Sequence, residues 1–65
     1  MKSTFKEYDV VIATQTLSER IKKGTKGVIL LILDAENGVY EAEFVDSLEV
    51  TLGVITVDAM SIEHA

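Results

Sequence analysis

The pattern of apolar and polar positions is most regular over residues 22–44, where it predicts a β-hairpin. An unbroken apolar run fills residues 28–33, the turn-forming stretch DAENG follows, and apolar and polar residues then alternate over residues 39–44. Successive side chains of a strand point to opposite faces, so the second strand has one core face and one outer face. The predicted inward residues are Tyr40, Ala42 and Phe44, and the predicted outward residues are Glu41 and Glu43.

The apolar run in the first strand of this hairpin is longer than a half-buried strand needs. It begins with Val28, ends with Leu33 and is apolar at every position, whereas an antiparallel strand with one face in water alternates. Both faces of the strand therefore need cover. We expect the core on one side and, on the other, the segment of residues 15–25, a chain terminus or another molecule. A second copy of the chain paired along this strand would form a homo-oligomer.

Three further strands complete the predicted sheet. Residues 8–14 are rich in β-branched side chains and form the first strand, and residues 49–57 form the fourth, with a bulge near Gly53. A helical turn over residues 58–60, capped by the Asp at its start, leads into a short last strand at residues 61–63.

The segment between the first two strands, residues 15–25, is polar apart from two isolated apolar residues, Leu17 and Ile21. Their spacing fits one helical turn, but Gly24 ends it. We therefore expect a long ordered loop that these two side chains fix to the core.

Five short strands, a long first loop and one helical turn before the last strand are typical of an all-β, SH3-like barrel. An OB-like barrel is the second choice, although it usually needs more residues. The 65 residues form a single domain, in which we expect residues 1–7 to fray. A domain of this size buries only about 60% of the surface that its unfolded chain exposes, so its stability is marginal.

Composition removes several classes of function. All six basic residues lie within the first 26 positions, and the chain from Gly27 onward carries eight acids and no Lys or Arg. The net charge of the whole chain is −5. Nucleic-acid binders of this size usually carry a basic excess. Cysteine is absent, so there is no disulfide or thiolate zinc site. No apolar stretch is long enough to span a membrane and no signal peptide is recognisable, so we expect a cytoplasmic protein.

The clearest candidate site is acidic. Glu41 and Glu43 share a strand face, and Asp46 and Glu49 follow across a turn. Four neighbouring carboxylates suit a basic protein partner, although an exposed strand face kept polar against edge-to-edge association has the same pattern. We expect no metal site, because no calcium-loop spacing is present, and no cofactor. The single histidine, His64, has no catalytic partner placed by a motif, so we expect no enzyme.

Four segments carry a resemblance to a known family. The stretches DVVIAT, IKKGTKGVI, NGVYEAEFVD and TLGVITV, at residues 9–14, 21–29, 37–46 and 51–57, resemble short bacterial proteins grouped as domain of unknown function 4926. The resemblance implies an SH3-like fold related in shape to ribosome-associated KOW modules, and it brings no catalytic residues to transfer. Some relatives are encoded beside toxin domains, which implies an immunity or antitoxin role.

Three functions follow as hypotheses. The first is a small acidic protein-binding module that docks through its acidic face and its exposed apolar strand. It blocks the active site of a basic toxin enzyme, with Glu41, Glu43, Asp46 and Glu49 mimicking phosphate. The second, from the resemblance to KOW modules, is an RNA- or ribosome-associated accessory protein acting through Lys22, Lys23 and Lys26, with Tyr8 and Tyr40 more suited to the core than to base stacking. The third is the structural homo-oligomer.

Overall fold

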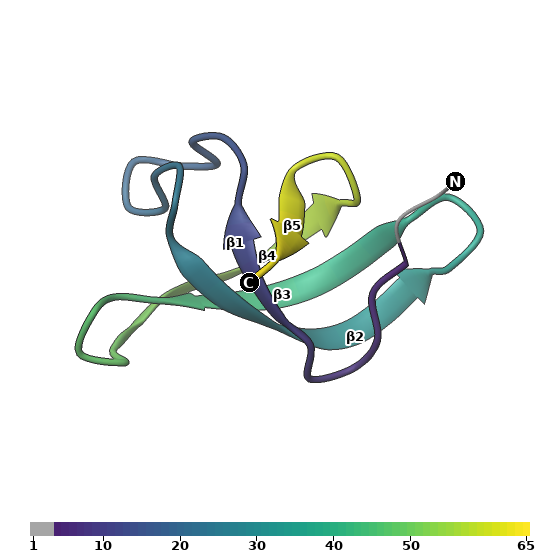
Figure 1. Cartoon of the computed structure of the whole chain (residues 1–65), viewed down its shortest axis with the longest axis horizontal. Helices are drawn as coiled ribbons and strands as arrows, with labels where there is room; N and C mark the ends of the chain where they lie inside the picture. Colours follow the sequence, from purple (N-terminus) through teal and green to yellow (C-terminus); the bar gives the residue numbers. More distant parts are fainter. Residues whose placement is uncertain (1–3) are drawn as a thin grey trace.

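The fold is a single antiparallel sheet. A computed structural model describes residues 4–65 of the chain, and no helix occurs within this range. The all-β, five-stranded prediction is confirmed, and the strands are arranged in the order β4-β3-β2-β1-β5 (Figure 1). Their bounds are β1 Val10–Ala13, β2 Lys26–Asp34, β3 Val39–Val45, β4 Thr51–Asp58 and β5 Ile62–His64.

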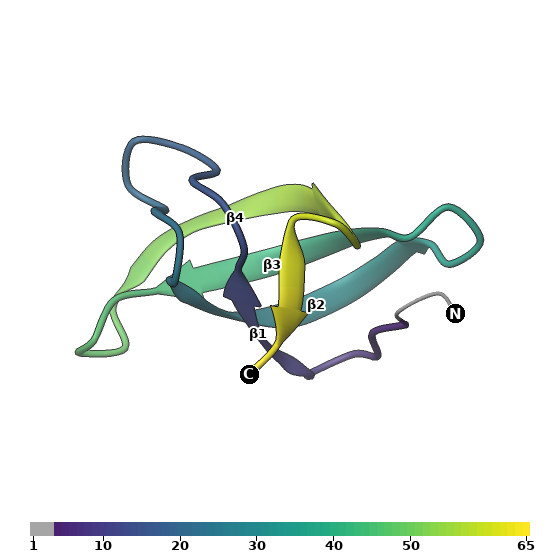
Figure 2. The same cartoon turned by 45° about the horizontal axis from the view of Figure 1, so that its top comes forward.

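The sheet folds over itself around β2, its central strand. The first part of β2 pairs with β1, whereas β3 pairs with β2 along nearly its whole length. Figure 2 shows β1 and β5 crossing steeply over the meander of β2, β3 and β4. In the described part of the chain, β4 and β5 are the two edges of the sheet and do not pair with each other, so backbone hydrogen bonds do not close the predicted barrel.

The core lies between the two parts of the sheet. Tyr40, Ala42 and Phe44 of β3 are all buried, as the alternation predicts. Gly27 of β2 makes room for the ring of Phe44, because a Cβ atom at this position would lie 2.7 Å from Cδ1 of Phe44. The other buried hydrophobic residues are Phe5, Val11, Ala13, Ile21, Ile29, Val57 and Ile62.

The loop between β1 and β2 has the predicted character. Ile21 is 1% exposed in the core, and Leu17 packs against the core while partly buried. The backbone N–H of Leu17 donates to the carbonyl of Ile21 at 2.8 Å, which closes the segment that these side chains anchor. The loop is therefore ordered without helix.

The connection from β4 to β5 differs from the prediction of a helical turn. The N–H of Ser61 donates to the carbonyl of Asp58 at 3.1 Å, which makes a single β-turn. Asp58 does cap it, since its Oδ1 accepts hydrogen bonds from the backbone of Met60 and Ser61, both at 3.0 Å. The Asp58 side chain therefore binds the backbone N–H groups of the turn, and no residue of the turn is helical.

The two ends of the chain depart further from expectation. Residues 1–3 lie outside the described part, but Phe5, predicted to fray, is 3% exposed and packs edge-to-face on Tyr40 at 5.5 Å. His64, near the other end of the chain, belongs to β5 and stacks on Phe5 with ring centroids 4.4 Å apart. Tyr8, predicted to be in the core, is 72% exposed. Phe5 supplies the aromatic ring that Tyr8 was expected to provide.

Candidate functional site

The side of the sheet opposite the core forms a mixed apolar and acidic surface. Cross-strand register places Glu43 between Val28 and Val54, and Glu41 between Leu31 and Thr56. Val10 of β1 lies next to Val28 in the same row. The sequence neighbours of Val28, Glu41 and Glu43 are buried, so these three side chains point away from the core, and their cross-strand partners lie on the same side of the sheet. We call this set the outer face; it consists of Val10, Val28, Leu31, Glu41, Glu43, Val54 and Thr56.

The outer face exposes more apolar side chain than the sequence predicted. Val10, Leu31 and Val54 are 44%, 48% and 47% exposed. Glu41 and Glu43, both half-buried, lie among them on β3, and a carboxylate oxygen of Glu43 accepts a hydrogen bond from the Thr51 hydroxyl. The predicted outward direction of both glutamates is confirmed. Leu31 belongs to the apolar run predicted to need cover, but the contributions of Val10 and Val54 were missed because register across strands is not visible in one sequence.

The second half of β2 extends this surface. Register shifts occur between Ile29 and Leu31 and again between Ile32 and Asp34, so that two residues of β2 are extra to the ladder. Ile32 and Leu33 are 41% and 51% exposed. Pairing of β1 with β2 ends at Val28, so β1 does not reach this end of the strand. Ile29 of the predicted apolar run is buried in the core, but no described residue buries the last three residues of the run, Leu31, Ile32 and Leu33.

The other two predicted acids have different surroundings. Oδ1 of Asp46 accepts hydrogen bonds from the backbone of Leu48 and Val50, at 2.8 and 3.0 Å, and so holds the β3–β4 turn. Glu49, in the same turn, has a positive φ of 65° and forms an ion pair with Lys26 at 2.8 Å. The predicted set of four carboxylates therefore separates into two on the outer face and two in the turn. In the described range no three His, Asp or Glu residues form a group that could hold a metal ion.

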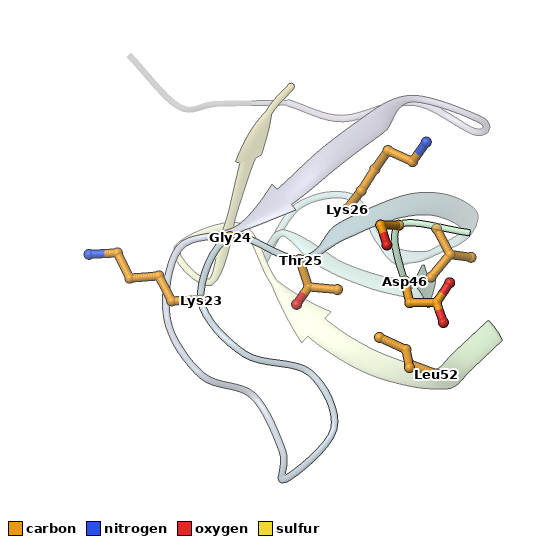
Figure 3. Close-up of a pocket in the computed structure, with 8 residues that line it drawn as sticks. Lys23, Gly24, Thr25, Lys26, Asp46 and Leu52 are labelled. Carbon is orange, nitrogen blue, oxygen red and sulfur yellow. The ribbon is translucent and has the colours of Figure 1, made fainter. Parts of the chain in front are cut away.

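A hollow of about 500 Å³ lies beside this turn, between the start of β2, the end of β3 and the start of β4 (Figure 3). Asp46 lines it, but the Asp46 carboxylate is engaged by the turn backbone. The Thr25 hydroxyl, also on its wall, donates to the carbonyl of Lys22 at 2.6 Å. Since these polar groups serve the fold, the hollow carries less recognition chemistry than the outer face.

The three lysines predicted as an RNA site do not form one surface. Lys23 and Lys26 extend to opposite sides of the hollow in Figure 3. Lys26 is paired with Glu49, whereas Lys22 and Lys23 are exposed in the loop. The exposed ion pair contributes little stability, but it lowers the positive charge that Lys26 presents.

Comparison with known proteins gives a family and no activity. The model of the family described as Domain of unknown function (DUF4926) matches residues 7–64, so the chain belongs to this family. No curated protein and no solved structure matches the chain significantly. Within residues 4–65 there is no helix with the length and apolar character needed to cross a membrane.

Proposed function

We propose that this DUF4926 protein is a binding module that docks through its outer face onto a protein carrying Lys or Arg side chains within an apolar surface. The observation that carries the proposal is the position of Glu41 and Glu43, two half-buried glutamates on the interior strand β3 with exposed valine and leucine side chains around them. A purely solvated strand face would not need this apolar surround.

The chemistry of such a face selects its partner. Docking would remove water from both carboxylates, and a desolvated carboxylate is costly unless a cation pairs with it. A basic group on the partner supplies that pairing, while Val10, Leu31 and Val54 contribute apolar contact area around it. Complementary charge also speeds the encounter and disfavours acidic partners.

In its most specific form, the partner is a basic toxin enzyme and the module is its cytoplasmic inhibitor. Glu41 and Glu43 would occupy the phosphate positions of the enzyme's active site, and the outer face would block access to it. Of the four acids expected to act this way, Asp46 and Glu49 are assigned to the turn and are left out of the proposed contact.

Partner capture tests the proposal. Immobilised wild-type chain is exposed to a native lysate, the retained protein is identified by mass spectrometry, and the purified partner is titrated calorimetrically at rising salt. We expect Glu41→Lys/Glu43→Lys to weaken binding at least 100-fold, since each reversal places like charges together and costs more than about 1.4 kcal/mol.

A control variant distinguishes the effect of the position of the two glutamates on binding from the effect of the net charge of the protein. Glu7→Lys/Glu19→Lys makes the same change in charge at exposed residues outside the outer face. Equal weakening by the two double variants would show general electrostatics rather than docking and would contradict the proposal. Retention of RNA in place of protein, lost on Lys22→Glu/Lys23→Glu, would support the RNA hypothesis instead.

A further inference from the structure

β4 has a free hydrogen-bonding edge. It is the last strand of the sheet, and among the described residues no backbone hydrogen bond outside the ladder involves residues 51–57. Ile29 of β2 directs its N–H and C=O toward the β1 side, so its partner Ala42 directs them toward β4. Ile55, opposite Ala42, is then bonded to β3, and the backbone groups of Val54 and Thr56 point to the free edge.

This edge lacks the features that usually keep edge strands apart. Sequence TLGVITV at residues 51–57 has no charged residue and no proline, and it is rich in β-branched side chains. Edge strands of monomers are commonly short or protected by Lys, Pro or an inward charge. With eight residues, β4 is nearly the longest strand of the sheet.

We propose that β4 pairs antiparallel with β4 of a second copy of this chain, on a two-fold axis at Ile55. In this register Val54 of one copy is opposite Thr56 of the other, and both residues have outward-pointing backbone groups. The two reciprocal pairs therefore form complete hydrogen-bonded pairs. The result is one continuous sheet through both copies.

Charge and burial favour a second copy as the occupant. In the register centred on Ile55, Leu52 is opposite Asp58 of the other copy and Thr51 is opposite its Ala59, so no two acids face each other. Ile55 lies on the core side of the sheet but is only partly buried, and the pairing brings it beside Ile55 of the second copy. A basic peptide strand would find no acid within residues 51–57 to pair with.

The proposal rests on the backbone edge of β4, whereas the proposed function uses the side chains of the outer face, to which Val54 and Thr56 also belong. It also differs from the homo-oligomer predicted through residues 28–33. β2 has a neighbouring strand on both sides over its first part, whereas β4 has no described strand beyond its free edge at residues 51–57. The predicted contact along β2 stays a prediction, and the edge of β4 offers more unpaired backbone.

Mass and amide exchange measured across a dilution series test the pairing. We expect sedimentation equilibrium to show monomer at low and dimer at high concentration, with no larger species. Amide exchange of Val54 and Thr56, followed by NMR, should slow about tenfold or more from the dilute to the concentrated sample, whereas that of Ile55 should change little. A monomer at every concentration, or exchange at Val54 and Thr56 that ignores concentration, overturns the proposal.

Two variants locate the contact. Thr56→Pro removes an outward-pointing N–H, which an edge strand tolerates, and Val54→Lys places a charge beside the edge; each should weaken the dimer at least tenfold. Leu48→Lys makes a matched change at a residue that is 80% exposed in the turn and should leave the dimer intact. A dimer that survives Val54→Lys, or assemblies larger than a dimer, would point to another surface and contradict the assignment.

Discussion

β3 and β4 are adjacent strands of one hairpin, yet their side chains are buried very differently. β3 has a strand on each side, and its residues alternate strictly between buried and half-buried. β4 has one neighbour, and Val57 is its only buried residue. The comparison shows that alternation decides which way a side chain points, whereas the position of the strand in the sheet decides how much cover it finds there.

Truncation of one side chain on each strand tests this difference most strongly. Phe44 of β3 is fully buried, whereas Val54 of β4 is 47% exposed. Phe44→Ala should cost about 3–5 kcal/mol through lost burial and a cavity, enough to unfold much of a small domain. Val54→Ala should stay within about 0.5 kcal/mol. Urea denaturation followed by circular dichroism at low protein concentration measures both, and similar losses would refute the comparison.

Two glycines sharpen the comparison at a smaller scale. An added Cβ at Gly27 would lie 2.7 Å from Cδ1 of Phe44, whereas one at Gly53 would lie 3.5 Å from Cδ1 of Ile21, an ordinary contact. We expect Gly27→Ala to destabilise by about 1–3 kcal/mol through overpacking against β3. Gly53→Ala on β4 should change stability by less than about 0.5 kcal/mol. Thermal unfolding of both variants shows which substitution destabilises the fold more, and a larger loss of stability for Gly53→Ala would contradict the comparison.

The smallest expected change in stability concerns Asp34, in the turn that leads into β3. Hydrogen bonds to Asp34 from the side chain and backbone of Asn37, at 2.8 and 3.1 Å, lower the pKa of this carboxyl below its usual 3.8. A lowered pKa in the folded state means that ionised Asp34 adds stability above pH 3.8 and that this contribution is lost as the pH falls below it.

Asp34→Asn should therefore lower the melting temperature slightly at pH 7, and the gap from wild type should close at acid pH below the folded-state pKa. Melting curves at both pH values measure it, with Glu63→Gln, at an exposed residue of β5, as a control for general charge removal. A gap that persists unchanged in acid would mean that the charge of Asp34 is not what stabilises the turn.

Local pattern predicted most of the fold. The strands, the DAENG turn, the core residues of β3 and the anchoring of the first loop by Ile21 all follow from periodicity and turn chemistry. The burial of Phe5 and its ring contact with exposed His64 were missed because they depend on a contact between the two ends of the chain, which leaves no periodic signal. Tyr8 was misplaced because a single aromatic residue next to a strand does not reveal its face.

The candidate site was predicted only in part. The direction of Glu41 and Glu43 follows from alternation, but the roles of Asp46 and Glu49 depend on turn geometry and on Lys26 from another strand. The exposed apolar ring depends on which residues pair across β1 to β4. Register between strands is a property of the assembled sheet, and so the composition of a sheet face is harder to predict than the direction of a single strand.

The pairing of β1 with β5 also bears on the order of folding. β2, β3 and β4 follow one another through short turns, whereas β1 pairs with a strand at the other end of the chain, with Val11 opposite His64. Loop-closure entropy makes distant contacts slower to form than local ones. We therefore expect the meander of β2, β3 and β4 to nucleate folding and the two ends of the chain to meet last.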